Sequence, residues 1–126
     1  MDNKYFVPFE IVDELEKIGY NSQADHCLNS FDDRKESLVP RPIYSQVFDW
    51  FDKKGIYFAI KPVINKGNLT YIFQMVEFRN NDGSWTWSWM DDRHFLTRLE
   101  ANLAAVKKGI EILKYRIEND EQNPNY

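Results

Sequence analysis

The chain has 126 residues, with 16 Lys and Arg against 20 Asp and Glu, which gives a formal net charge of -4. That length suits one domain and is too short for two independent cores. Hydrophobic residues make up 43% of the chain and aromatic residues 16%, enough to form one core without disulfides or metal. The acidic balance argues against a surface that neutralises many phosphates, because such binding depends on clustered Lys and Arg.

The cysteine and targeting signals indicate the cytoplasm. The single cysteine, Cys27, cannot form an intramolecular disulfide, and no Cys-x-x-Cys spacing is present for a zinc or redox site. Residues Met1 to Tyr5 lack the basic start and the apolar run of a signal peptide, and no apolar stretch is long enough to cross a bilayer. We therefore expect a cytoplasmic protein with no membrane partner.

The first third of the chain predicts two short helices joined by an irregular segment. A helix is expected from Pro8 to Ile18, where apolar residues recur on one face, and Gly19 supplies its C-terminal stop. The stretch from Asn21 to Pro42 mixes polar residues and Pro with isolated apolar residues, which is typical of an irregular connection. A second helix is expected from Tyr44 to Lys54, with Ser45 as its N-cap.

Strands follow the second helix. The runs from Ile56 to Ile64 and from Leu69 to Phe78 are rich in β-branched and aromatic residues. The Asn and Gly between them, at Asn65 to Asn68, predict a tight hairpin loop. A second turn cluster at Asn80 to Gly83 leads into Ser84 to Trp89, whose alternation of large apolar and small polar residues has the period of a strand.

The last part of the chain predicts a long helix. Thr97 and Glu100 have the spacing of a capping box, so the helix is expected to start there. Its apolar residues then form one stripe: Leu99, Leu103, Val106, Ile110, Leu113 and Ile117. Small residues next to the stripe are expected to let the helix backbone lie close to the sheet: Ala101, Ala104, Ala105 and Gly109.

These elements together predict the α+β class. The expected architecture is a three-stranded antiparallel β-meander packed against the long C-terminal helix, with the element order α-α-β-β-β-α. Residues 1–118 are expected to form a single domain and residues 119–126 a disordered tail.

Three tryptophans on the predicted third strand, Trp85, Trp87 and Trp89, must project from one face of the sheet. In one interpretation they form a stacking platform for nucleobases or sugars. In the other they face the C-terminal helix as core residues, because the small polar residues between them suit the solvent side of a strand. We favour the core interpretation.

No catalytic constellation, metal site or cofactor motif is evident in the sequence. The two histidines, His26 and His94, lie far apart, and with Cys27 they form a thin set of ligands. Adjacent carboxylates such as Asp32-Asp33 and Asp91-Asp92 more often solvate turns than perform acid-base chemistry. No phosphate-binding Gly-rich loop, nucleophile elbow or His-Glu-x-x-His motif occurs. We therefore predict no catalytic residues and no enzyme activity.

The order of helix, three strands and helix from Tyr44 to Ile117 is also that of a double-stranded RNA-binding domain. Such domains grip phosphates with basic residues at the start of the last helix. Here residues 91–98 combine Asp91, Asp92, Arg93, His94 and Arg98, and Lys107 and Lys108 lie further along the helix. The cluster of basic residues that would bind phosphates at the start of the last helix is therefore largely missing.

Several segments together resemble a family of small uncharacterised proteins of Bacteroides-type bacteria and their phages and prophages. They are the helix from Phe9-Glu10 to Gly19-Tyr20, the segment Pro42 to Phe51, the strand pair, and the helix start Glu100 to Leu103. The resemblance covers most of the chain through loose apolar and aromatic patterns. It implies a phage-related context and no mechanism or site residues.

The leading functional hypothesis is a non-catalytic protein-interaction module that binds a protein partner or self-associates. The alternative is a nucleic-acid-binding protein that stacks bases on aromatic residues of the sheet. An enzyme of unknown type ranks third. The candidate binding residues are Tyr57, Lys61, Tyr71, Phe73, Trp85, Trp87 and Trp89.

Overall fold

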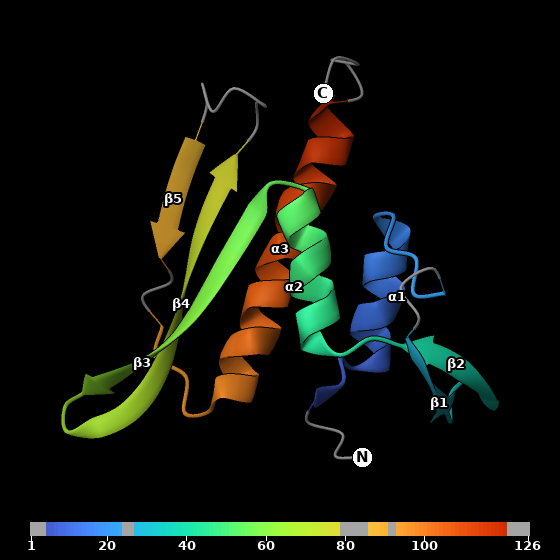
Figure 1. Ribbon diagram of the computed structural model, residues 1–126, viewed down its shortest axis with the longest axis horizontal. Helices are drawn as coiled ribbons and strands as arrows, with labels where there is room; N and C mark the ends of the chain where they lie inside the picture. Colours follow the sequence, from blue (N-terminus) through green and yellow to red (C-terminus); the bar gives the residue numbers. More distant parts are fainter. Residues whose placement is uncertain (1–4, 24–26, 79–85, 91–92, 121–126) are drawn as a thin grey trace.

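The computed structural model describes residues 5–23, 27–78, 86–90 and 93–120, without the side chains of 86–90 and 120. The general α+β class and the long C-terminal helix are confirmed (Figure 1). The elements are α1 (Phe9–Lys17), β1 (Leu28–Asp32), β2 (Ser37–Arg41), α2 (Tyr44–Lys53), β3 (Ile56–Asn65), β4 (Asn68–Phe78), β5 (Thr86–Met90) and α3 (Arg98–Asp120). No helix in these ranges is long and apolar enough to span a membrane.

The two short helices form where the sequence predicts them. α1 ends at Lys17, and Gly19 follows with a φ of 105°, in the left-handed region. The Tyr20 N–H then donates to the Leu15 carbonyl at 3.0 Å. α2 differs in its cap. The expected cap at Ser45 is wrong, because Ile43 is the N-cap and its N–H donates to Oε1 of Gln46 at 3.0 Å.

The segment from Asn21 to Pro42 is not wholly irregular, and the expected order α-α-β-β-β-α is wrong at this point. β1 and β2 pair antiparallel in a two-stranded sheet, with Phe31 opposite Leu38 and Asp32 opposite Ser37. The strands escape sequence analysis because polar residues and Pro40 interrupt any alternation of apolar residues.

The second sheet has the order β3-β4-β5, and both strand pairs are antiparallel. The predicted hairpin of β3 and β4 is confirmed, and its loop is Lys66-Gly67 with φ angles of 52° and 81°. Two successive positive φ angles are what a tight hairpin turn with the native strand twist requires. Beyond β5, Phe95 pairs with Tyr71 of β4 through two N–H to carbonyl bonds of 2.8 Å each.

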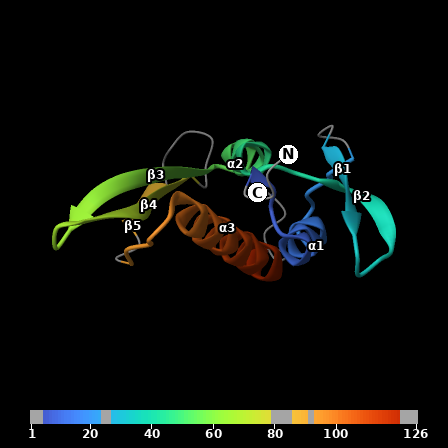
Figure 2. The same cartoon turned by 90° about the horizontal axis from the view of Figure 1, so that it is seen from below.

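The core lies between the three-stranded sheet and the helices. We call the helix-facing side of this sheet its inner face; it carries Ile56 and Phe58 of β3 with Phe73 and Met75 of β4. Figure 2 shows α3 lying along one side of the sheet, with α1 beside α3. The ring of Phe58 contacts aromatic rings of α2 and β4, which ties three elements together.

α3 starts as predicted, with the Glu100 N–H donating to Oγ1 of Thr97 at 3.1 Å. The middle of its apolar stripe is buried, but Leu99 and Ile117 at the two ends are 39% and 46% exposed. The helix continues to Asp120, so residues 119 and 120 are helical and not part of a tail; residues 121–126 lie outside the described residues.

α3 contacts β3, β4 and α2, and one of its small residues, Gly109, faces α2. Ala101 and Ala105 are fully buried, and a Cβ on Gly109 would lie 2.5 Å from Cζ of Phe51. Gly109 therefore admits the aromatic ring of α2 rather than the sheet.

Candidate interaction surface

The predicted binding residues of β3 and β4 do not share one surface. Tyr71 and Phe73 are opposite Pro62 and Ile60, which places them on the inner face, and Phe73 is fully buried. Tyr57 and Lys61 belong to the alternate set of β3 residues and are exposed on the opposite face, which we call the outer face. A single stacking surface made of all four residues is therefore excluded.

The tryptophan row is only partly within the described residues. Trp85 lies outside them, and the register places Trp87 opposite Glu77 and Trp89 opposite Met75. Both interpretations of these side chains stay predictions.

Among the residues whose side chains are described, Tyr57 and Phe78 form an exposed aromatic pair on the outer face. Tyr57 and Phe78 are 43% and 41% exposed, and their rings meet edge to face with centroids 5.6 Å apart. Val76, opposite Tyr57, extends this apolar area. Because the two rings contact each other, much of their contact surface is already used.

The strongest apolar exposure lies at the far end of the β3–β4 hairpin. This hairpin extends past the start of α3 (Figures 1 and 2), so its inner face is uncovered there. Ile64 and Leu69 are register partners on that face and are 71% and 54% exposed. Leu96, next to the Phe95 that pairs with Tyr71, is 74% exposed. Exposed clusters of large apolar residues of this kind usually mark interaction sites.

The segments that carry these apolar residues are basic. Lys66 lies in the turn between Ile64 and Leu69, whereas Lys61 is exposed on the outer face. Residues 57–76 and 93–99 contain four of the 16 Lys and Arg residues and none of the 20 Asp and Glu. The four are Lys61, Lys66, Arg93 and Arg98. The rest of the chain therefore carries 12 basic and 20 acidic residues, a formal charge of -8. We call these four basic residues, together with Ile64, Leu69 and Leu96, the basic end.

Two contacts fix the connector that precedes α3 against the hairpin. The hydroxyl of Thr70 lies within hydrogen-bond distance of two groups, the Val63 carbonyl oxygen at 3.2 Å and Nδ1 of His94 at 2.9 Å. The guanidinium of Arg98 lies 5.1 Å from the centroid of the Tyr71 ring. Within the described residues, no carboxylate forms an ion pair with Lys61, Lys66 or Arg98.

A groove of about 380 Å³ adjoins the basic end. It begins at Arg93 and Phe95, where the guanidinium carbon lies 5.2 Å from the ring centroid, and it follows α3 along Leu103 to Lys107 and Glu111. Three basic and two acidic side chains line the groove: Arg93, Lys107, Lys108, Glu100 and Glu111. The groove therefore adds a concave surface next to the basic end and has a formal charge of the same sign.

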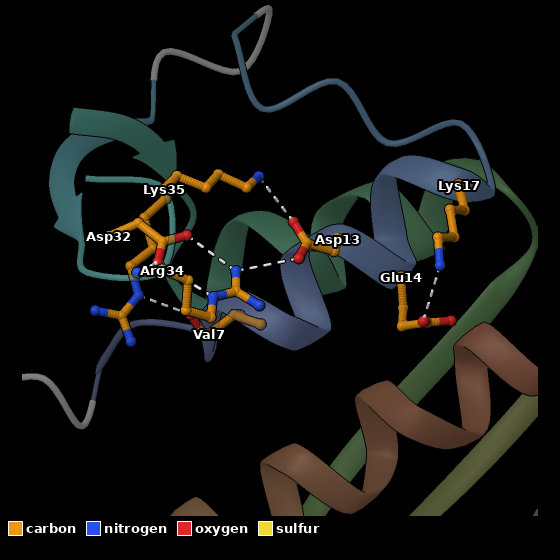
Figure 3. A network of polar contacts seen from close by, with 8 residues as sticks. Val7, Asp13, Glu14, Lys17, Asp32, Arg34 and Lys35 are labelled. Carbon is orange, nitrogen blue, oxygen red and sulfur yellow. Dashed lines mark hydrogen bonds and ion pairs between the residues drawn. The ribbon is translucent and has the colours of Figure 1, made fainter. Parts of the chain in front are cut away.

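The opposite end of the molecule is the β1–β2 hairpin, and polar contacts attach it to α1 (Figure 3). Asp32 is 1% exposed and accepts hydrogen bonds from Nε and Nη2 of Arg34 at 3.1 and 2.9 Å. The hydrogen bonds from Arg34 hold the pKa of Asp32 below its usual range, against the opposing effect of burial. Asp13 of α1 then pairs with Arg34 at 3.1 Å and with Lys35 at 3.2 Å.

Arg41 of β2 makes a second set of contacts with the segment at the start of α1. Its Nε donates to the Val7 carbonyl at 2.8 Å, and its guanidinium carbon lies 4.2 Å from the centroid of the Phe9 ring. Burial lowers the pKa of Arg41 from its ordinary value. Together the contacts of Arg34, Lys35 and Arg41 hold the inward side of the hairpin against α1.

The outward side of this hairpin carries exposed apolar residues and negative charge. Phe31 and Leu38 are register partners, 56% and 66% exposed. The two cations of the turn, Arg34 and Lys35, pair with carboxylates of the hairpin and α1. The remaining turn residues, Asp33 and Glu36, form no ion pair with any described residue. We call Phe31, Leu38, Asp33 and Glu36 the acidic end.

The described residues contain no group of three or more His, Cys, Asp or Glu side chains that would hold a metal ion. Cys27 is half-buried, and its Sγ lies 3.7 Å from the Tyr20 hydroxyl. His26 lies outside the described residues.

Comparison with known proteins gives no match to a family model, to a curated protein or to a solved structure. The resemblance to phage-related proteins therefore stays a prediction.

Of the residues that make up the two ends, only Lys61 was among the predicted binding residues. The sequence does hold one signal for the basic end, which is the absence of any Asp or Glu between residues 57 and 76. Leu96 and Arg98 lie next to the hairpin because Phe95 pairs with Tyr71, and no local sequence pattern predicts that pairing.

Proposed function

We propose that the protein is a non-catalytic interaction module whose basic end binds an acidic, apolar segment of a protein. The observation that supports this is the exposure of Ile64, Leu69 and Leu96 in segments that contain four basic residues and no acidic residue. The module acts in the cytoplasm, a reducing compartment that suits its single cysteine.

The two components of this surface have different roles in binding. Burial of apolar area supplies most of the affinity, at about 25 cal/mol for each Å² removed from water. The charges of Lys61, Lys66 and Arg98, none of which forms an ion pair with a described carboxylate, select the sign of the partner and accelerate its encounter. A partner with a negative rim and an apolar centre satisfies both components.

Nucleic acid fits this surface less well than protein does. Binding of single strands uses exposed aromatic faces, whereas Ile64, Leu69 and Leu96 are aliphatic. Tyr57, an exposed aromatic residue on the same face as Lys61, already has its ring against Phe78. Tyr71, close to Leu69 in sequence, already has Arg98 over its ring. A protein segment is therefore the better ligand for this surface, and nucleic acid is included in the binding test as a competitor.

The proposal is tested by selection from a random peptide display library on the immobilised chain. We expect enriched peptides to combine Asp or Glu with Leu, Ile or Phe. Their dissociation constants, measured by fluorescence anisotropy, are expected to rise about tenfold or more in Ile64→Asp, because a charge then opposes the apolar contact. Tyr115→Asp on α3, where the ring is 62% exposed, is the matched control and is expected to bind like the wild type.

Salt and nucleic acid complete this test. Peptide binding is expected to weaken between about 0.1 M and about 1 M NaCl, where the Debye length falls from about 10 Å to about 3 Å. Peptides that bind Ile64→Asp as tightly as the wild type would contradict the proposal. So would single-stranded or double-stranded RNA that binds more tightly than every selected peptide.

A further inference from the structure

We propose that the acidic, apolar segment bound by the basic end is the acidic end of a second copy of this chain. This inference rests on the proposed function and names its partner. The copies would join head to tail, with Phe31 and Leu38 of one copy against Ile64 and Leu69 of the next.

The two ends match in construction and differ in charge. Each is a β-hairpin whose strands present one exposed apolar register pair. Each turn also has a charged residue with a left-handed backbone, Glu36 with φ of 50° in one and Lys66 with φ of 52° in the other. The charges that lack an ion-pair partner within the described residues are negative at one end and positive at the other.

The acidic end is held ready for docking by the contacts behind it. Asp32 and Asp13 draw Arg34 and Lys35 toward α1, which leaves Asp33 and Glu36 as the outward charges of the turn. A hairpin fixed in this way loses little conformational entropy on binding. Its outward side therefore offers a preformed apolar surface with a negative rim.

The arrangement of the ends in space selects a head-to-tail contact. Figures 1 and 2 show the two hairpins at opposite ends of the longest axis, so one chain cannot close the contact on itself. A symmetric pairing of two basic ends through Ile64 and Leu69 would bring the Lys66 turns of both copies together, and like charges oppose such a pairing. Joining unlike surfaces produces open chains or rings.

The size of the ends sets the expected strength. Stable complexes bury about 800 Å² per partner, and two hairpin ends with a few exposed apolar residues offer less than that. Association is therefore expected to be weak, dependent on concentration and sensitive to salt.

The experiment uses two variants, each of which removes the apolar pair from one end. Phe31→Ser/Leu38→Ser removes it from the acidic end, and Ile64→Ser/Leu69→Ser from the basic end. All four positions are exposed, so both variants are expected to fold, which circular dichroism checks. Sedimentation equilibrium then measures self-association of the wild type, of each variant and of their equimolar mixture.

The wild type is expected to form dimers and longer species as its concentration rises, and each variant alone is expected to associate at least about tenfold more weakly. The mixture is the decisive sample. The Ile64→Ser/Leu69→Ser chain keeps an intact acidic end and the other variant an intact basic end. They are expected to form a one-to-one dimer of nearly wild-type affinity and no longer species.

Charge variants give an independent measurement if either Ser variant fails to fold. Asp33→Asn/Glu36→Gln preserves side-chain shape at the turn and removes the outward negative charge. We expect it to weaken wild-type association several-fold at about 0.1 M salt and to have little effect at about 1 M. Equal association of this variant and the wild type at low salt would contradict the assigned contact.

Three results would overturn the head-to-tail contact: a wild type that stays monomeric, a single variant that still dimerises fully, or a mixture that forms no dimer. The peptide selection separates this failure from that of the proposed function. Monomeric protein whose basic end still selects acidic peptides refutes only the second copy as partner. Monomeric protein that selects no peptides refutes both.

Discussion

The two sheets of this protein are attached to its helices by different kinds of contact. On the three-stranded sheet, Phe58 and Phe73 pack against each other, and Phe58 also meets the rings of α2. On the two-stranded sheet, the side chain that faces inward most completely is Asp32, and Arg34 links it to α1. Apolar burial stabilises the first attachment, and ion pairs with hydrogen bonds stabilise the second.

This difference has consequences for stability. Apolar contacts are cooperative with the whole core and change little with pH or salt, so the three-stranded sheet should open only when the protein unfolds. The attachment of β1 and β2 depends on the ionisation of Asp32 and on partly exposed partners. The hairpin should therefore open locally under conditions that the rest of the fold withstands.

The largest expected effect comes from the apolar side of the comparison. Phe73→Ala removes a fully buried ring from the centre of β4 and is expected to lower the free energy of unfolding by about 3 to 5 kcal/mol. Urea denaturation followed by tryptophan fluorescence measures this loss. Val76→Ala, on the exposed outer face of the same strand, is the control and is expected to cost about 0.5 kcal/mol. A loss below 1 kcal/mol for Phe73→Ala would show that the core does not depend on this ring.

The next effect concerns the polar contact inside the apolar attachment. Glu77 is 5% exposed on β4 and accepts hydrogen bonds from Arg116 of α3, which also donates to the Lys54 carbonyl at 2.8 Å. Arg116→Met leaves a buried carboxylate without its partner and is expected to cost about 3 kcal/mol. The double variant with Glu77→Gln is expected to lose less than the sum of the two single changes. A strictly additive cycle would mean that the two side chains do not interact.

Gly109→Ala tests how closely the helices pack. In an exposed helix this change gains about 1 kcal/mol of helix propensity. Here the new methyl group meets the Phe51 ring, so we expect a net loss of about 1 to 3 kcal/mol in urea denaturation. Combining it with Phe51→Leu, which makes room for the methyl, should recover part of the loss. A stabilised Gly109→Ala variant would contradict the close packing.

The smallest and most local effect is expected in the two-stranded sheet. The folded-state pKa of Asp32 lies below its unfolded value, so its contribution is present above the unfolded pKa and is lost as pH falls through the folded pKa. During an acid titration, the amide resonances of β1 and β2 should therefore change before those of β3 and β4. Arg34→Met is expected to produce the same local opening at neutral pH. Simultaneous changes in both sheets would show that the hairpin is not a separate unit.

Elements whose signals are local could be predicted from the sequence. The capping residues Thr97 and Glu100, the Lys66-Gly67 turn, and the aromatic and β-branched strands before and after it all gave correct predictions. The β1–β2 hairpin could not be predicted, because its residues lack an apolar alternation and its stability comes from contacts with α1.

The candidate surface divides in the same way. The sequence alone determined that residues 57–76 are basic and free of carboxylates, because charge is a property of composition. It did not determine which residues of the strands share a face, because register depends on the pairing of two strands. Only the tertiary structure brought Leu96 and Arg98 beside the hairpin through Phe95 and Tyr71, left Ile64 and Leu69 uncovered beyond α3, and placed the basic and acidic ends far apart. Such exposure arises from where the covering elements end, and that depends on contacts between residues distant in the sequence.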